Sequence, residues 1–145
     1  MGIKVLVCDD LGLSRSVIRH TIESAPDIEV VGEAEGGKSA VALAVRLHPD
    51  VVLMDIVMPD VNGIEATRQI VQGTGGVKVL AVSMHSDTRY VRAVLVAGAS
   101  GYVLKNYAHE ELAQAIHAVM TGKTYLSPGL GGAEPSVPGS EPLTL

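Results

Sequence analysis

The residues best suited to chemistry in this chain stand at the ends of short apolar runs. Asp9 and Asp10 follow the first run, Asp55 follows the third, Ser83 closes the fourth and Lys105 closes the fifth. One polar group at a strand end carries little information. In an open parallel sheet, however, the carboxyl ends of the strands share an edge, and ligands bind outside that edge. The four strand ends together therefore predict one site.

Three carboxylates in one pocket repel each other, by roughly 1 to 4 kcal/mol for each close pair. Such a group must shift its pKa values or bind a cation, and all-oxygen ligation without Cys or convergent His suits Mg²⁺. A carboxylate can also attack phosphorus and form an acyl phosphate. Lys105 could then neutralise the phosphoryl oxygens, and the Ser83 hydroxyl could donate a hydrogen bond to them.

The elements that must position these residues alternate between short apolar runs and stretches of helical period. Because strands that alternate with helices form a parallel sheet with crossover helices, the pattern predicts a three-layer α/β fold. The predicted strands are residues 3–7, 28–33, 51–54, 77–83 and 101–105, and the predicted helices lie near 14–25, 40–47, 63–72, 91–95 and 112–120.

The composition indicates one soluble domain followed by a tail. The chain has 145 residues, is 47% hydrophobic, and contains no apolar run near the eighteen residues needed to span a bilayer. The N-terminus has the pattern of a first strand, and Cys8 is the only cysteine in the sequence. Both features favour a cytoplasmic protein. The net charge of -5 argues against direct nucleic-acid binding. We expect a domain at 1–125 and, because Gly and Pro are frequent there, a flexible linker or tail at 126–145.

Four motifs give this chain a family resemblance. They are "CDD" at 8–10, "VLMDIVMPDVNGIEA" at 52–66, "VLAVSMH" at 79–85 and "AGASGYVLK" at 97–105. The set resembles the receiver domain of bacterial two-component response regulators. The resemblance implies a flavodoxin-like (CheY-like) (βα)5 fold with a five-stranded parallel sheet in the order 2-1-3-4-5. Together with "GKTYLSPGL" at 122–130, the fourth motif resembles the NarL/FixJ-like subfamily, whose receivers precede a LuxR-type helix-turn-helix.

The resemblance implies a role for each acidic residue. Asp55 would accept a phosphoryl group from a phosphohistidine of a sensor histidine kinase. Asp10 would ligate Mg²⁺ directly together with Asp55, Asp9 would act mostly through water, and the backbone carbonyl of Val57 would supply a further ligand. The only reactions of the chain itself would be self-phosphorylation at Asp55 and slow autodephosphorylation.

The resemblance also implies a switch and a set of partners. Lys105 would pair with the phosphoryl group, Ser83 would move toward it, and Tyr102 would change rotamer as Ser83 moves. This change would drive a homodimeric, transcriptional output. DNA would be bound only through a C-terminal helix-turn-helix domain outside this chain, and no membrane would be involved.

Two other functions compete with this interpretation. The first is a receiver fold that serves as a phosphate-independent interaction module, which the complete acceptor site disfavours. The second is a small Mg²⁺-dependent phosphohydrolase of the haloacid dehalogenase type. That class needs a second Asp two residues after the nucleophile, and here Val57 occupies the position.

Overall fold

The computed structural model of this chain describes residues 2–58 and 61–130. Strands and helices alternate along it, as the sequence predicts. The strands are β1 (Ile3–Cys8), β2 (Ile28–Ala34), β3 (Val51–Met54), β4 (Lys78–Ser83), β5 (Gly101–Leu104) and β6 (Tyr125–Leu126). The helices are α1 (Gly12–Glu23), α2 (Gly37–Leu47), α3 (Gly63–Gly73), α4 (Thr88–Val96), the 3-10 turn η1 (Lys105–Tyr107) and α5 (Ala108–Met120).

The strands form one parallel sheet in the order β2-β1-β3-β4-β5-β6. The first five follow the expected 2-1-3-4-5 order, but the sheet has a sixth strand that the sequence interpretation omitted. In β6, Tyr125 and Leu126 pair with Gly101 and Tyr102 at the outer edge of β5. A strand of two residues is too short to show an alternating pattern, so no periodicity could have revealed it.

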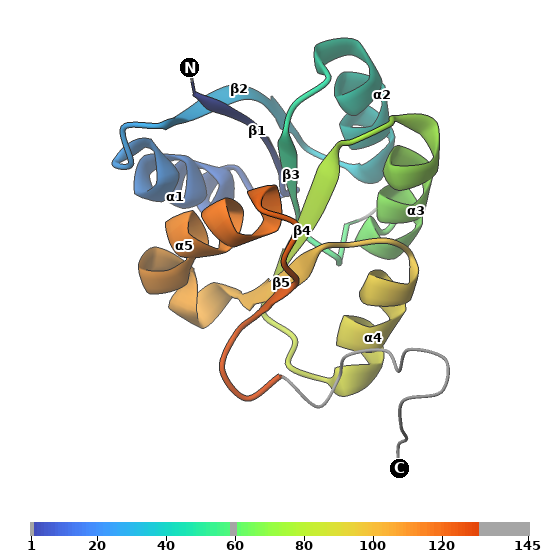
Figure 1. Cartoon of the computed structure of the whole chain (residues 1–145). Helices are drawn as coiled ribbons and strands as arrows, with labels where there is room; N and C mark the ends of the chain where they lie inside the picture. The colour runs from blue at the N-terminus through green and yellow to red at the C-terminus, as the bar shows by residue number, and fades with distance from the viewer. Residues whose placement is uncertain (1, 59–60, 131–145) are drawn as a thin grey trace.

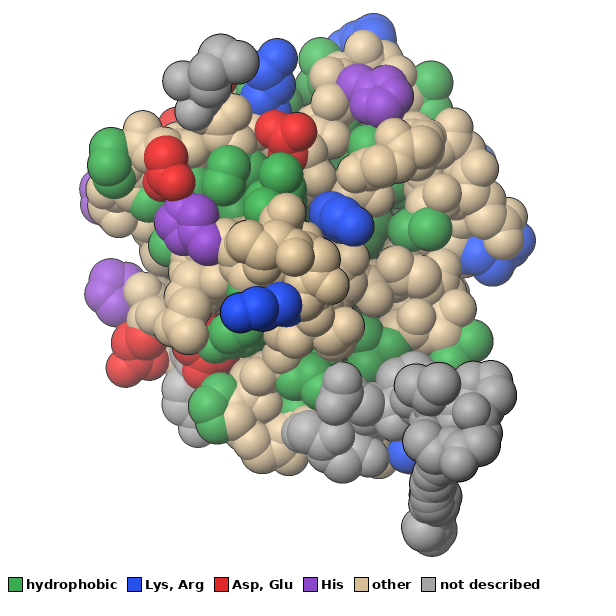
Figure 2. All heavy atoms as spheres, viewed as in Figure 1, with side chains coloured by type: hydrophobic (Ala, Val, Ile, Leu, Met, Phe, Trp, Pro, Cys, Tyr) green, Lys and Arg blue, Asp and Glu red, His purple; other side chains and the backbone are tan. Residues whose placement is uncertain are grey.

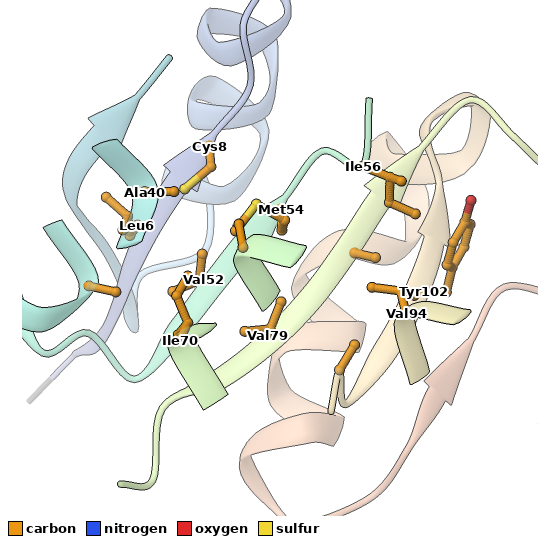
Figure 3. Close-up of a cluster of buried hydrophobic side chains, with 14 of the residues drawn as sticks. Leu6, Cys8, Ala40, Val52, Met54, Ile56, Ile70, Val79, Val94 and Tyr102 are labelled. Atoms are coloured by element: carbon orange, nitrogen blue, oxygen red, sulfur yellow. The ribbon is translucent and has the colours of Figure 1, made fainter. Parts of the chain in front are cut away.

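Helices cover both faces of the sheet and make the three layers (Figure 1). Helices α1 and α5 lie together on one face, and α2, α3 and α4 lie on the other. Each interface has its own apolar core. Figure 3 shows the core beneath α2, α3 and α4, where Met54 of β3 and Val79 of β4 meet Ala40 and Ile70 of the covering helices.

The central strand β3 explains why an apolar run leads to a carboxylate. All four of its residues are buried, because helices cover both faces of a strand in the middle of a parallel sheet. Beyond Met54 the chain leaves the sheet at its carboxyl edge. Asp55 is therefore the first residue that can combine burial of its backbone with access to a ligand.

The ordered fold continues past the expected domain boundary. Ser127 and Leu130 are buried, at 1% and 4% exposure, and Leu130 belongs to the core beneath α2 to α4. The Ser127 hydroxyl accepts a hydrogen bond from the Leu104 N–H at 2.9 Å and donates one to Glu111 at 2.7 Å. Residues 126–130 thus pack on the domain instead of forming a flexible segment. The rest of the expected linker, 131–145, lies outside the described residues.

Two features bear on binding to nucleic acid or to a membrane, namely the distribution of basic side chains on one face and the length of the described helices. On the face drawn in Figure 2, the described Lys and Arg side chains stand apart from one another. Within residues 2–58 and 61–130, none of the helices has both the length and the apolar character needed to cross a bilayer.

Candidate functional site

The strand register brings the predicted site residues to one edge of the sheet. Cys8 of β1 pairs with Met54 of β3, so the residues that follow, Asp9 and Asp55, leave the sheet side by side. Ser83 of β4 pairs with Leu104 of β5, which places Lys105 just beyond Ser83 at the same edge. The predicted convergence of four strand ends is therefore present.

Asp9 is completely buried and its carboxylate is held by three donors. Its Oδ1 accepts the Leu11 N–H at 3.0 Å. Its Oδ2 accepts both the Ser14 hydroxyl at 2.6 Å and the Lys105 ammonium at 2.7 Å. An acid that is buried with this many donors is fixed in place.

Lys105 also contacts the acid at the end of β3. Its Nζ lies 3.3 Å from Asp55 Oδ2, so one ammonium bridges Asp9 and Asp55. The other oxygen of Asp55, Oδ1, accepts the N–H of Val57 at 3.3 Å. Compared with Asp9, Asp55 has fewer and longer hydrogen bonds.

The two buried acids differ in the direction of their pKa shifts. Burial acts to raise the pKa of Asp9, but hydrogen bonds from Lys105, Ser14 and the Leu11 N–H outweigh it, and the pKa is lowered. Burial raises the pKa of Asp55, and the charge of Asp9 adds to this, while Lys105 opposes it only in part. Asp9 is thus a firmly ionised neighbour, and Asp55 is the acid that gains most from additional positive charge.

The third acid is Asp10, which is exposed where the other two are buried. One carboxylate oxygen from each of Asp9, Asp10 and Asp55 lies within 4.8 Å of the others. Asp10, Asp55 and Val57 line a surface cavity of about 240 Å³. Three clustered carboxylates beside a water-accessible cavity fit a hard divalent cation such as Mg²⁺, which retains part of its water shell.

Ser83 and Lys105 line the same cavity, together with Met84 and His85. Ser83 is 1% exposed, and its hydroxyl oxygen accepts the His85 N–H at 3.1 Å. The Ser83 hydroxyl also interacts with the side chain of Tyr102. The side chains of Asp9, Asp10, Asp55, Ser83 and Lys105 thus lie together at one edge of the sheet.

Tyr102 lies beneath this site. Its ring is fully buried among the side chains drawn in Figure 3, and its hydroxyl donates to the carbonyl of His85 at 2.6 Å. Burial raises the pKa of this phenol. His85 thus connects Tyr102 to Ser83 through its backbone, since its carbonyl accepts from one and its N–H donates to the other.

Sequence reasoning missed Ser14 as a member of this site. It lies in the first turn of α1, four residues after the acid pair, and its hydroxyl reaches back to Asp9. The only signal available was a serine near the start of a helix that follows two acids, and this pattern is also typical of an ordinary helix cap.

A comparison with known protein families decides the identity of this domain. Residues 5–117 match the model of the response regulator receiver domain. The chain belongs to this family. The receiver is 44% identical over 126 residues to the transcriptional regulatory protein DegU of Brevibacillus brevis, covering 87% of this chain and 53% of that protein. It is 42% identical over 130 residues to LiaR of Bacillus subtilis, covering 90% of this chain and 62% of LiaR.

Solved structures place the receiver in the same group. A LuxR-family two-component response regulator from Aurantimonas has a TM-score of 0.86 and 37% identity, with coverage of 90% of this chain and 93% of that chain. The signal receiver domain of NarL from Mycobacterium tuberculosis has a TM-score of 0.81 and 30% identity, with coverage of 84% and 98%. The receiver therefore resembles those of LuxR- and NarL-type regulators, and it spans between about half and two thirds of the length of the two curated relatives above.

Proposed function

We propose that this receiver accepts a phosphoryl group on Asp55 from a phosphohistidine of a sensor kinase. The observation that carries the proposal is the position of Lys105, whose ammonium bridges Asp9 and Asp55 beside the exposed Asp10. An acceptor acid, acids that can bind a metal, and a cation beside the acceptor are the parts that phosphoryl transfer requires.

In the transfer step, a carboxylate oxygen of Asp55 attacks phosphorus as the P–N bond to the donor imidazole breaks. Because the donor ring carries a proton on its other nitrogen, it leaves as neutral imidazole, and an acyl phosphate remains on Asp55. Asp10 and Asp55 would hold Mg²⁺ directly, with the carbonyl of Val57 as a further ligand and Asp9 acting through water. When bound, Mg²⁺ supplies charge neutralisation between the carboxylates and the phosphoryl oxygens.

Lys105 and Ser83 then respond to the new group. The phosphoryl group carries more negative charge than the free carboxylate, so the ammonium of Lys105 is drawn from Asp9 toward it. Ser83 lines the same cavity, and its hydroxyl would turn to donate to a phosphoryl oxygen. Movement of Ser83 would change the hydrogen bonds of His85 and thereby the packing of Tyr102.

The output of this switch is proposed from the relatives. DegU and LiaR are both transcriptional regulatory proteins and are longer than this chain. In the full-length protein, the switch would control dimerisation. The dimer would bind DNA in the cytoplasm through a C-terminal helix-turn-helix. The connection to that domain would then begin with residues 126–130, which are held on the receiver.

The two competing functions are less well supported. A phosphate-independent module has no need for a lysine held between two buried acids. A phosphohydrolase of the haloacid dehalogenase type needs an acid at position 57, and Val57 offers only a backbone N–H to Asp55.

Acetyl phosphate tests the proposal directly. We expect the protein incubated with Mg²⁺ and acetyl phosphate to gain the mass of one phosphoryl group, and we expect Asp55→Asn to gain none. Asp60 is the nearest other acid in the same sequence motif, and Asp60→Asn serves as the matched control that keeps the adduct. A wild-type protein without an adduct would favour the phosphate-independent module instead.

A further inference from the structure

Ser14 makes a contact that the proposed phosphorylation site does not by itself explain. Its hydroxyl donates to Asp9 Oδ2 at 2.6 Å, and Asp9 is fully buried. Ser14 stands in the first turn of α1, so a rigid element fixes the direction of this hydrogen bond. The side chain is only half-buried, which means that burial alone does not account for its orientation.

The hydrogen bonds of Asp9 divide unevenly between its two oxygens. A carboxylate offers about two acceptor positions on each oxygen. On Oδ2 both positions are used, by Ser14 and by Lys105. On Oδ1 one position is used, by the N–H of Leu11. The oxygen with a remaining position is therefore Oδ1, and the donors on Oδ2 determine which way it faces.

The two donors on Oδ2 are not equivalent. Lys105 also contacts Asp55 Oδ2, at 3.3 Å, and is shared between the two acids. Within the described residues, Ser14 has Asp9 as its side-chain partner, and it carries no charge that a phosphoryl group could attract. A buried carboxylate oxygen that loses a donor is costly, so Ser14 matters most when Lys105 turns toward Asp55.

From these contacts we infer that Ser14 is a positioning residue for the metal site. It holds the Asp9 carboxylate so that Oδ1 serves the water shell of Mg²⁺, and it does so independently of where Lys105 points. The inference rests on the proposed function, since it assumes that Asp9, Asp10 and Asp55 surround Mg²⁺. It adds a residue of α1, outside the four strand ends, to the machinery of the site.

Calorimetric titration with MgCl₂ tests the role. Because removal of a partner that orients a metal ligand typically lowers metal affinity, we expect Ser14→Ala to weaken Mg²⁺ binding roughly tenfold. Ser14→Thr keeps a hydroxyl and is expected to bind Mg²⁺ like the wild type. Ser14→Val has the shape of Thr but no hydroxyl, so it is expected to bind Mg²⁺ as weakly as Ser14→Ala. Ser16→Ala is the matched control, because Ser16 is exposed in the same helix and makes no side-chain hydrogen bond in the described part of the chain.

A second readout separates positioning from general damage to the site. With acetyl phosphate as donor, we expect Ser14→Ala to need more Mg²⁺ for half-maximal phosphorylation while reaching the wild-type rate at saturating Mg²⁺. Wild-type protein that binds no Mg²⁺ would overturn the proposed site and the inference together. Two other results would overturn the inference alone. One is that Ser14→Ala binds Mg²⁺ as tightly as the wild type does. The other is that Ser14→Thr and Ser14→Val bind Mg²⁺ with the same affinity.

Discussion

At the scale of single residues, the site depends on an asymmetry between two buried acids. Asp9 has a lowered pKa and three donors, whereas Asp55 has a raised pKa and weaker partners. Lys105 joins them, and although burial opposes its charge, the two acids raise its pKa. The residue types predicted the members of this cluster, because carboxyl ends of parallel strands meet at one edge. The residue types could not predict how many hydrogen-bond donors each of Asp9 and Asp55 receives, because that number depends on where α1 places the Ser14 side chain.

The shared position of Lys105 leads to a prediction about signalling. We expect Lys105→Ala to retain Mg²⁺ binding and some phosphorylation, but to lose any change in oligomeric state that phosphorylation causes, because no ammonium remains to follow the phosphoryl group. Light scattering coupled to size-exclusion chromatography, with and without acetyl phosphate, measures this change. Lys123→Ala, an exposed lysine without an ion pair among the described residues, is the control. A full phosphorylation-dependent response in Lys105→Ala would remove Lys105 from the proposed role.

A second prediction concerns the charge pairs that fasten α1 to β2. Glu33 accepts from Arg19 and Arg15, and the Arg19 hydrogen bond in particular lowers the pKa of Glu33. A lowered pKa means that the folded state favours the ionised form, so this stabilisation is complete above about pH 5 and is lost as the pH falls through the lowered pKa.

Accordingly, Glu33→Gln should lower the free energy of unfolding by about 1 kcal/mol or less at pH 7, since the pairs are partly exposed. The difference from wild type should vanish at acidic pH. Urea denaturation over a series of pH values measures it. Glu29→Gln, in the same strand but without an ion pair in the described part of the chain, should show no such pH dependence. A constant difference at every pH would contradict the explanation.

At the scale of elements, the helix that follows Asp55 is placed by a close backbone approach. The N–H of Gly63 donates to the carbonyl of Ile56 at 2.6 Å, and α3 is capped by Asn62, whose side chain accepts from the Glu65 N–H. A Cβ at position 63 would meet the carbonyl oxygen of Asp55 and lie 2.5 Å from the Cα of Ile56. The sequence showed an Asn-Gly pair at this point, but it could not show what the glycine faces.

We therefore expect Gly63→Ala to lower the free energy of unfolding by about 3 kcal/mol, because backbone atoms cannot move aside as flexible side chains do. Gly73→Ala is the matched control at the other end of α3, where a Cβ meets no atom within 4 Å. That change should be neutral or stabilise by up to about 1 kcal/mol. Chemical denaturation of both variants measures the contrast. Equal stabilities would show that α3 can shift away from Asp55 without cost.

The end of β5 is held by the segment that follows α5. The Ser127 hydroxyl connects the backbone of Leu104, next to Lys105, with the carboxylate of Glu111 in α5, and Tyr125 also donates to Glu111. Composition predicted a flexible segment here because Gly and Pro are frequent. Composition could not indicate that the Ser127 hydroxyl accepts from the Leu104 N–H and donates to Glu111, because these contacts join residues that are distant in the sequence.

Loss of this hydroxyl should be costly. Ser127→Ala leaves the Leu104 N–H without its acceptor and Glu111 with only the Tyr125 hydroxyl as a side-chain donor, so we expect a loss of roughly 1 to 3 kcal/mol in the free energy of unfolding. Ser24→Ala, an exposed serine whose hydroxyl bonds to the Thr21 carbonyl, should cost less. Thermal and urea denaturation measure both. A Ser127→Ala protein as stable as the wild type would contradict the view that residues 126–130 belong to the fold.

At the scale of the whole molecule, the alternation of elements predicted a parallel sheet with the polar strand ends at one edge, and the family resemblance predicted the order of the first five strands. The parts that escaped prediction are those defined by contacts between distant segments, such as β6 against β5 and Ser14 against Asp9. Binary patterning specifies which face of an element is buried, but not which polar atoms meet across the edge of a sheet.

The most direct test of the account is a crystal structure of the protein with Mg²⁺ and beryllium trifluoride, which imitates a phosphoryl group on a carboxylate. We expect the trifluoride on Asp55, Mg²⁺ ligated by Asp10, Asp55 and the carbonyl of Val57, and the ammonium of Lys105 moved from Asp9 to a fluorine atom. Mg²⁺ bound away from these acids, or Lys105 still paired only with Asp9 beside an occupied Asp55, would contradict the account.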